Sequence, residues 1–452
     1  MEKPDITSEV KRRILILDGA MGSLIQAKLP SYRGCNDELC LTRPDLISSI
    51  HREYLQAGAD IIESCSFNAN PVSLADYGLA DRAAEISAAA AALAAAEAAS
   101  FSTPEKPRFV AGSMGPTAKS GSIPSDMADP AARAIGWDEL EAAYYENARG
   151  LLDGGVDFFL VETIFDALNA KAALAALFRL FEERGVEKPV MLSATLNESG
   201  RLLTGQTIEA FLAAVLHARP FAAGFNCSFG ADKLLPHIKT LAGIAPCAVS
   251  VYPNAGLPNA AGIYDHTPRI MASSLESYMK ESLINILGGC CGSTPEHIAA
   301  LAEAARGYAP RPFSARGADA AGPAEYIPAG FSGLELLPPV KTTPLPPTGL
   351  SAFIEKGDYD EAVELLRDGA GSGPVAVSFD KSLSPEKVSA FTRLALFYPD
   401  ITRYPFIIES SRWDLIEAAL KCLQGRSMVR FKGVMEGEEL KRRLKRYGAA
   451  SV

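Results

Sequence analysis

Short apolar runs alternate with longer Ala-, Leu- and Glu-rich stretches over the first 305 residues. Eight of the runs have the continuous apolar character of parallel strands that are covered on both faces. They are residues 14–20, 59–67, 108–115, 158–164, 189–196, 222–228, 247–256 and 284–291. Eight βα units over this length predict a (β/α)8 barrel. A doubly wound open sheet is the alternative, but the first turn, DGAMGSLIQ, lacks the G-x-G-x-x-G spacing common in such folds.

The pattern changes after the eighth unit. Residues 311–349 are rich in Pro, Gly and Ala, which predicts a partly extended linker or a strap over another surface. Residues 350–452 again alternate helix and strand patterns, but only about three βα units fit, too few to close a barrel. We therefore expect a barrel over residues 1–310, the linker, and a small open or incomplete-barrel α/β unit whose sheet has an edge to cover.

Composition and charge narrow the class of protein. The chain has 452 residues, 48% hydrophobic and 22% charged, so it can bury more than one core. Its net charge of -10 and pI near 5.2 argue against binding to nucleic acid or an anionic membrane.

The basic run LKRRLKRYG (440–448) is expected on the solvated face of a helix, and the Ala-rich stretch 83–100 on an outer barrel helix. No secretory leader pattern opens the chain, which predicts a cytoplasmic protein.

Polar and reactive residues stand where the apolar runs end. The carboxyl ends of barrel strands share one face, and barrels carry their active sites there. The residues at these positions are Asp18, Glu63, Asn68, Glu162, Thr163, Thr195, Asn226, Cys227, Asn254, Cys290 and Cys291.

Three cysteines stand out among these residues. Cys227 ends the sixth run, and Cys290 and Cys291 stand among glycines in GGCCG at the end of the eighth. The glycines let the backbone leave the extended form, so that neighbouring side chains can serve one centre. A helix start follows, with Ser293 or Thr294 as its N-cap and Glu296 closing a capping box.

Three thiolates that leave one position open are typical of a catalytic zinc site. Two alternatives remain: Cys227 is a buried apolar residue beside an incidental pair, or the pair forms a strained vicinal disulfide. The other cysteines, Cys35, Cys40, Cys65, Cys247 and Cys422, are expected to serve packing.

The donor set favours one reaction class. Three thiolates leave zinc with a charge of roughly -1, which suits holding a substrate thiol as thiolate better than activating water. A free thiol has a pKa of about 8.5 and is mostly protonated at neutral pH. We therefore expect thiol alkylation. Asp18 and Glu162 are suited to bind the ammonium of an amino-acid substrate, and the Gly19 and Ala20 amides its carboxylate, although Asp18 also fits a simple turn residue.

Several motifs together resemble a known family. They are LDGAMGSLIQ, GADIIESCSFNAN, GSMGPT, VETIFDALNAKAAL, SGRLLTGQT, GFNCSFGAD, VYPNAGLPN and GGCCGSTPEHI. Over residues 8–305 they resemble the homocysteine-binding barrel of cobalamin-dependent methionine synthase, which is similar to the betaine-homocysteine and S-methylmethionine-homocysteine methyltransferases. The resemblance implies zinc on Cys227, Cys290 and Cys291, with homocysteine sulfur as a further ligand. It also implies that the substrate amine lies near Asp18 and Glu162, and that Asn254 occupies or borders the open metal position when substrate is absent. Thr195 completes the expected substrate-binding set.

Residues 350–450 look like the first half of the same enzyme's folate-binding barrel, through YDEAVELLRDGA, PFIIESSRWDLIEAALKCLQG and LKRRLKRYGAA. The family's N-V-G-E-R-T-N entry strand is absent, and Glu409 stands where an Asp is usual. A structural remnant that packs against the first barrel is therefore favoured over folate binding through Asp380 or Glu409. No D-x-H-x-x-G element for corrinoid ligation occurs, so methylcobalamin, if it is the donor, must arrive on a separate protein.

The resemblance and the expected chemistry together predict a zinc-dependent homocysteine S-methyltransferase that transfers a methyl group to the zinc-bound thiolate of homocysteine and forms methionine. The alternative is a non-catalytic subunit that binds zinc and homocysteine and docks a separate corrinoid protein. S-Methylmethionine, S-adenosylmethionine and betaine remain open as donors beside methylcobalamin, and another thiol or selenol remains open as the acceptor.

Overall fold

Eight parallel strands form a closed barrel in the computed structural model, which describes residues 4–259, 264–313, 346–369 and 373–451. The strands pair in the order β1-β8-β7-β6-β5-β4-β3-β2, and Leu17 bridges Ile61 to close the ring. Their bounds are β1 Leu15–Ile16, β2 Ile61–Glu63, β3 Phe109–Met114, β4 Phe158–Ile164, β5 Val190–Ala194, β6 Ala222–Cys227, β7 Ala248–Pro253 and β8 Ile286–Leu287. The predicted barrel is confirmed, and the open-sheet alternative is wrong.

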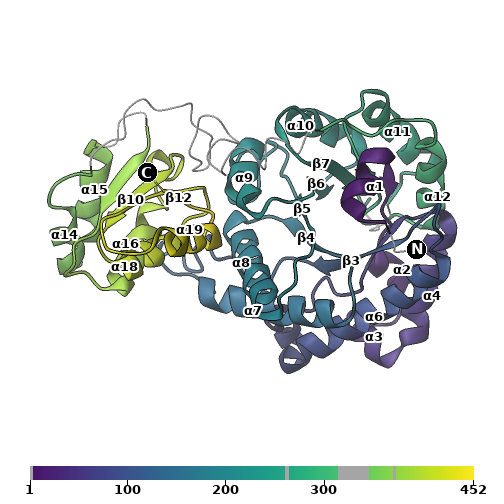
Figure 1. The fold of residues 1–452 in the computed structure, drawn as a ribbon, viewed down its shortest axis with the longest axis horizontal. Helices are drawn as coiled ribbons and strands as arrows, with labels where there is room; N and C mark the ends of the chain where they lie inside the picture. The colour runs from purple at the N-terminus through teal and green to yellow at the C-terminus, as the bar shows by residue number, and fades with distance from the viewer. Residues whose placement is uncertain (1–3, 260–263, 314–345, 370–372, 452) are drawn as a thin grey trace.

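Helices surround the strands, as Figure 1 shows. The helices up to residue 304 are α1 Ile6–Arg12, α2 Met21–Lys28, α3 Leu39–Thr42, α4 Pro44–Ala57, α5 Pro71–Leu74, α6 Ala83–Phe101, α7 Trp137–Asp153, α8 Ala167–Arg184, α9 Ile208–Val215, α10 Ala231–Ile244, α11 Pro268–Lys280 and α12 Pro295–Ala304. Short 3-10 helices cover η1 Ala75–Tyr77, η2 Ala80–Arg82 and η3 Leu216–Ala218.

Helix α6 is long and apolar enough to cross a membrane by length and composition, but it packs in the outer ring of the barrel against α4 and α7. Gly150 of α7 and Gly154, its C-cap, permit the close contact. A Cβ on Gly150 would lie 2.2 Å from the Ala84 carbonyl oxygen, and one on Gly154 would lie 2.5 Å from that of Ala88. The position expected for this helix is confirmed.

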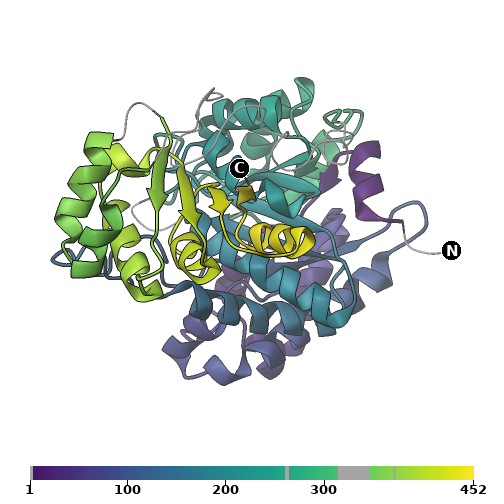
Figure 2. The ribbon, with the colours of Figure 1, turned by 60° about the vertical axis from the view of Figure 1, so that its left-hand side comes forward.

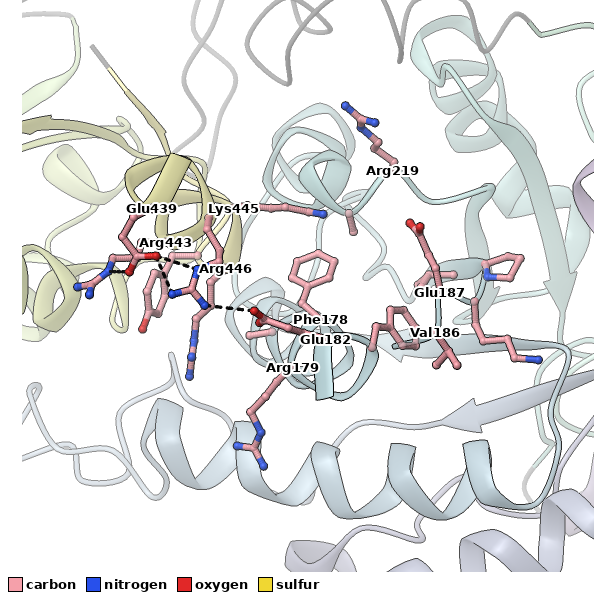
Figure 3. A pocket seen from close by; sticks show the side chains of 18 of the residues that line it. Phe178, Arg179, Glu182, Val186, Glu187, Arg219, Glu439, Arg443, Lys445 and Arg446 are labelled. Atoms are coloured by element: carbon pink, nitrogen blue, oxygen red, sulfur yellow. Dashed lines mark hydrogen bonds and ion pairs between the residues drawn. The ribbon is translucent and has the colours of Figure 1, made fainter. Parts of the chain in front are cut away.

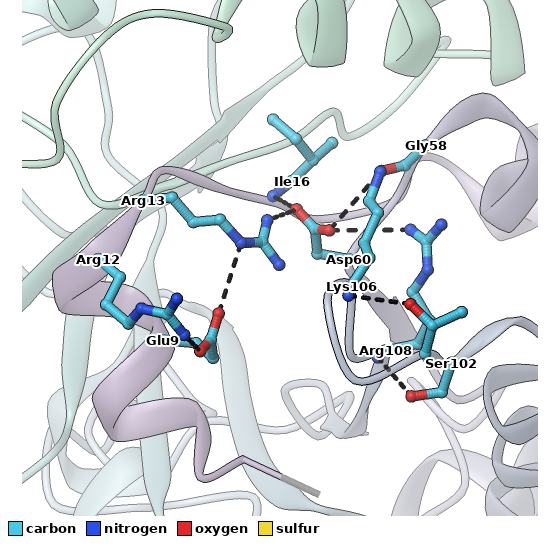
Figure 4. Close-up of polar contacts among 10 residues, drawn as sticks. Glu9, Arg12, Arg13, Ile16, Gly58, Asp60, Ser102, Lys106 and Arg108 are labelled. Carbon is cyan, nitrogen blue, oxygen red and sulfur yellow. Dashed lines mark hydrogen bonds and ion pairs between the residues drawn. The ribbon is translucent and has the colours of Figure 1, made fainter.

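The amino-terminal end of the barrel is held by a buried carboxylate (Figure 4). Asp60 is 1% exposed and accepts a hydrogen bond from the Ile16 amide at 3.0 Å. Its Oδ2 lies 2.7 Å from Arg13 Nη1, and its Oδ1 lies 3.7 Å from Arg108 Nη1 and 3.9 Å from Lys106 Nζ. Three cations therefore converge on one carboxylate at the end opposite the candidate site.

A second, four-stranded parallel sheet follows, in the order β12-β11-β10-β9 (Figure 2). Its strands are β9 Val375–Ser378, β10 Phe406–Ser410, β11 Met428–Phe431 and β12 Ala450–Ser451. Its helices are α14 Leu350–Lys356, α15 Tyr359–Gly369, α16 Pro385–Ala395, α17 Pro399–Thr402, α18 Trp413–Leu420 and α19 Gly437–Arg446. The expected small incomplete-barrel unit is confirmed, with one short strand more than the three that the sequence pattern indicated.

The second unit packs against the barrel through α19, which contacts α8. Arg446 of α19 donates to both carboxylate oxygens of the buried Glu141 in α7, at 2.8 and 2.7 Å. The Tyr447 ring packs at a tilt against Trp137, with 5.2 Å between the ring centroids. The interpretation of residues 440–448 as only a solvated helix face is therefore wrong for Arg446 and Tyr447, since these side chains contact α7 of the barrel.

A buried lysine joins the two units. Lys171 of α8 is 0% exposed, and its Nζ donates to the carbonyl oxygens of Leu423 at 2.8 Å and Gly425 at 3.1 Å. One continuous apolar core runs through both units. The expected packing of residues 350–452 on the barrel is thus observed.

Most of the proposed linker, residues 314–345, lies outside the described residues. At its start, Arg311 still packs on the barrel: its guanidinium donates to the carbonyl oxygens of Ala242, Ala245 and Cys247.

Candidate metal and substrate site

Three thiols from two strand ends meet at the carboxyl end of the barrel. The sulfurs of Cys227, Cys290 and Cys291 all lie within 4.8 Å of one another, and Cys227 Sγ is 3.7 Å from Cys291 Sγ. All three are free thiols of intermediate exposure. The expected convergence is observed, and neither a vicinal disulfide nor a buried, isolated Cys227 is present.

An unusual backbone conformation at the end of β6 sets the direction of the Cys227 side chain. Cys227 and Ser228 have φ of 58° and 60°, in the left-handed region that non-glycine residues rarely adopt. The residues that follow β5 hold this loop through Ser228. Thr195 Oγ1 lies 2.7 Å from Ser228 Oγ, and the Leu196 amide donates a hydrogen bond to the same oxygen. Such strain persists where the surrounding structure fixes it, and it is concentrated at functional sites.

The adjacent cysteines converge because the strand ends before them. β8 stops at Leu287, and a Cβ on Gly288 would lie 2.7 Å from Leu17 Cβ, so the close approach to β1 requires glycine. Gly292 has φ of 78°, and a Cβ there would lie 2.2 Å from Tyr264 Cγ. The eighth strand is therefore shorter than predicted, and the pair lies in a turn.

The helix after the pair starts as expected, with one difference. Thr294 is the N-cap of α12, and Pro295 is its first residue. The capping box is closed by His297, whose Nδ1 accepts from the Thr294 amide at 3.2 Å. Glu296 was expected in this role but instead accepts from the Thr294 hydroxyl at 2.6 Å, because it is one position too early to reach the N-cap amide.

The three thiols polarise one another. Hydrogen bonds from the Cys227 and Cys290 thiols lower the pKa of Cys291 to about 3. Contacts with the other two sulfurs, followed by burial, raise the pKa of Cys290 well above its usual value. One thiolate is thus stabilised at the expense of its neighbours, and a dication at the centre would stabilise all three. Three soft sulfur donors with no fourth protein ligand in the cluster, among the described residues, fit zinc with an open position.

A second cluster lies beside the thiols and consists of carboxyl groups. Asp18 and Glu162 are each 3% exposed. Glu63 lies close enough to both for their charges to act on it. Burial, followed by the charge of Glu162, raises the pKa of Asp18 and Glu63 well above their usual values. Burial and, less strongly, the Cys291 charge raise the pKa of Glu162 to about 7. Three carboxyl groups close together at the carboxyl end of the barrel favour the binding of a cation between them, such as a substrate ammonium.

These carboxyl groups are held in place by the barrel. Asp18 Oδ2 accepts from the Glu63 amide at 3.1 Å, and the Ser113 hydroxyl donates to Glu162 Oε1. Glu63 Oε1 is buried and has no hydrogen-bond partner in the described part of the chain. A buried acceptor without a donor is costly, so Glu63 has capacity left for a ligand.

The remaining predicted residues border the two clusters. The Asn254 side chain accepts from the Cys291 amide at 3.1 Å, which places it beside the thiols. The Ala20 amide already donates to Ser293 Oγ at 3.2 Å, whereas the Gly19 amide has no partner within the described ranges. Thr195 also lies at the carboxyl end of the barrel and is hydrogen-bonded to Ser228. Binding of substrate by these residues stays a prediction.

Sequence reasoning missed some neighbours of the site. Glu63 was noted at a strand end but not assigned to substrate binding, although its position after β2 matches those of Asp18 and Glu162. Asn226 was noted in the same way. Its side chain accepts a hydrogen bond from the Thr163 amide at 3.0 Å and donates one to the Thr163 hydroxyl at 2.8 Å. Tyr264 contacts Cys291 from a loop that carries no motif.

Comparisons with known proteins agree with this architecture. A family model described as homocysteine S-methyltransferase matches residues 15–305, more than half of the chain. The structure is similar to the homocysteine methyltransferase MmuM from Escherichia coli. The oxidised form has 24% sequence identity and a TM-score of 0.52 over 64% of this chain and 94% of that chain. The metallated form has 24% identity and a TM-score of 0.51 over 65% and 96%. These two structures show the shared fold.

Proposed function

The chain belongs to the homocysteine S-methyltransferase family, and from this premise we propose that it is a zinc-dependent enzyme that methylates homocysteine to methionine. The convergence of Cys227, Cys290 and Cys291 within 4.8 Å is the observation that carries the proposal. The description of one MmuM structure as metallated supports a metal in this fold.

Cys227, Cys290 and Cys291 would hold zinc, which would supply an open coordination position and lower the pKa of a substrate thiol. The chain's own residues act on the rest of the substrate. Asp18, Glu63 and Glu162 bind its ammonium group. The Gly19 amide, which has no partner among the described residues, donates a hydrogen bond to its carboxylate. Asn254, fixed by the Cys291 amide, borders the sulfur.

The reaction itself is an in-line displacement. The homocysteine sulfur attacks the donor's methyl carbon, the new carbon–sulfur bond forms as the bond to the leaving group breaks, and the leaving group keeps the electron pair. Fixing the sulfur at the cysteines and the ammonium at the carboxylates leaves one direction for attack, which lowers the entropic barrier. The donor is methylcobalamin on a separate corrinoid protein, or S-methylmethionine, S-adenosylmethionine or betaine. We place the enzyme in the cytoplasm, as the sequence predicts.

The deciding experiment measures zinc and turnover in the same preparation. We expect one zinc per chain, and methionine from homocysteine with at least one of the four donors. Cys291→Ser should lose zinc and reduce turnover by about a hundredfold or more. Cys422→Ser, a buried cysteine of the second unit, is the matched control and should keep both. A zinc-free wild type that methylates homocysteine equally well contradicts the proposal, and homocysteine binding without turnover favours the non-catalytic subunit.

A further inference from the structure

A cavity of about 990 Å³ lies between the barrel and the second unit (Figure 3). It is lined by α8, by the starts of β5 and β6 and by α19, at the end of the barrel opposite the cysteines. Its volume is in the range of small-molecule sites, which often form where two domains meet.

The cavity carries an excess of positive charge. Seven cationic and four anionic side chains line it, although the whole chain has a net charge of -10. Most of these cations have carboxylate partners: Glu439 pairs with Arg442 and Arg443, and Glu141 with Arg446. A locally positive cavity in an acidic protein attracts anions.

The side chains of two of the cations, Lys445 and Arg219, form neither a hydrogen bond nor an ion pair among the described residues, whereas Lys188 donates to the Val156 carbonyl oxygen. The Lys445 ammonium lies 4.7 Å from the centre of the Phe178 ring. Figure 3 shows Lys445 reaching from α19 across the top of Phe178, with Arg219 above it on the barrel side. The two units therefore each contribute one cation whose binding capacity is unused.

The backbone at Arg219 is also unusual. Arg219 follows η3 with φ of 49°, a conformation in which glycine or asparagine is the usual residue. A long cationic side chain is thus held on a strained backbone at the edge of the cavity. Strain of this kind supports a functional hypothesis, since glycine would fit the turn without cost.

Apolar side chains form the floor below the two cations. Phe178 and Phe181 of α8 line the cavity, and Val186, which follows the helix, is 39% exposed there. Trp413 closes the side that belongs to the second unit. An anion alone would leave this apolar surface in water, whereas a ligand with an aromatic or apolar body would cover it.

We propose that this interdomain cavity binds a small organic anion, a phosphate or carboxylate attached to an aromatic or apolar body. The anionic group is held by Lys445 and Arg219, and the body packs on Phe178. Glu187, which also lines the cavity, accepts a hydrogen bond from a hydroxyl or amino group of the ligand. Because both units contribute, binding strengthens their contact.

The test uses isothermal titration calorimetry on the full chain with three probes: 1-naphthyl phosphate, inorganic phosphate and 1-naphthol. We expect 1-naphthyl phosphate to bind at least tenfold more tightly than either of the other two. The double variant Lys445→Gln, Arg219→Gln should weaken its binding by at least tenfold, the loss expected for a charge-assisted contact. Lys441→Gln is the matched control, because Lys441 lies on the same helix, is 74% exposed and pairs with Glu438.

A separate variant distinguishes binding from folding. Arg219→Gly removes the charge and relieves the backbone strain, so it should bind 1-naphthyl phosphate more weakly while its melting temperature stays at or above that of the wild type. Zinc content and homocysteine binding should not change in any of these variants. Equal binding by the wild type and the double variant, equal binding of phosphate and naphthyl phosphate, or no binding by the wild type overturns the proposal.

Discussion

Lys171 of the barrel donates a hydrogen bond of 2.8 Å to the carbonyl oxygen of Leu423, with its ammonium group fully enclosed between the two units. Burial lowers the pKa of Lys171 to about 7. An ammonium without a carboxylate partner is held here by carbonyl dipoles alone. The contact between the units therefore depends on pH.

The sign of this dependence follows from proton binding. Between pH 7 and the usual lysine pKa of about 10.4, the unfolded chain binds more protons at Lys171 than the folded chain. The free energy of unfolding should therefore rise with pH across this window, by at most about 1.4 kcal/mol per pH unit from this residue. His217, which lies nearby, has its pKa lowered by burial to about 3 and stays neutral throughout.

Urea unfolding at several pH values from 6.5 to 10 measures this contribution. Lys171→Met keeps most of the side-chain volume and removes the titrating group, so its stability should rise less steeply with pH than that of the wild type. Identical slopes for the two proteins would show that Lys171 does not titrate in this range.

Glu162→Gln tests recognition of the substrate ammonium. The variant should lower kcat/KM for homocysteine by about tenfold to a hundredfold, because a charge-assisted hydrogen bond contributes roughly 1.5–3 kcal/mol. The same variant should have little effect on 4-mercaptobutyrate, which has the thiol and carboxylate but no amine. Steady-state kinetics with both thiols separate the two outcomes, and an equal loss for both would argue against the assigned role. Glu303→Gln, an exposed carboxylate on α12, is the control.

Asp60→Asn tests the amino-terminal end of the barrel. The change keeps the shape of the side chain but leaves Arg13, Lys106 and Arg108 without their shared counter-charge. Removing one partner of a buried ion pair costs about 3 kcal/mol or more, so the denaturation midpoint should fall clearly. Arg82→Gln breaks an exposed pair with Glu85 and should change stability by less than about 1 kcal/mol. A similar small effect at Asp60 would refute the central role given to that carboxylate.

Gly150→Ala tests the contact between α6 and α7. The new methyl group would meet the Ala84 carbonyl oxygen at 2.2 Å, so the helices must separate, at a cost of about 1–3 kcal/mol. Gly243→Ala, in a helix with nothing within 4 Å of the new atom, should instead stabilise by about 0.5–1 kcal/mol. Thermal unfolding of the two variants should thus shift in opposite directions, and a shared direction would mean that helix propensity outweighs the packing at Gly150.

The barrel and its cysteine site were predictable because both follow from local patterns. Eight apolar runs define the strands, and the carboxyl ends of parallel strands share one rim, so Cys227 had to lie near Cys290 and Cys291. Contacts between distant side chains left no comparable signal. The charge pattern of residues 440–448 gives no hint that Arg446 meets Glu141, 305 positions away. Whether His297 or Glu296 closes the capping box of α12 depends on which side chain can reach the N-cap amide.

The enclosed amine of Lys171 also limits how this polypeptide can be divided. A fragment that ends at residue 313 would present Lys171, Phe178 and Trp137 to water, and the carbonyl groups of Leu423 and Gly425 would leave with the missing piece. Newly wetted aromatic surface of this kind promotes self-association. Truncation is therefore a poor route to a minimal catalyst, and crystallisation or engineering should begin from the intact protein.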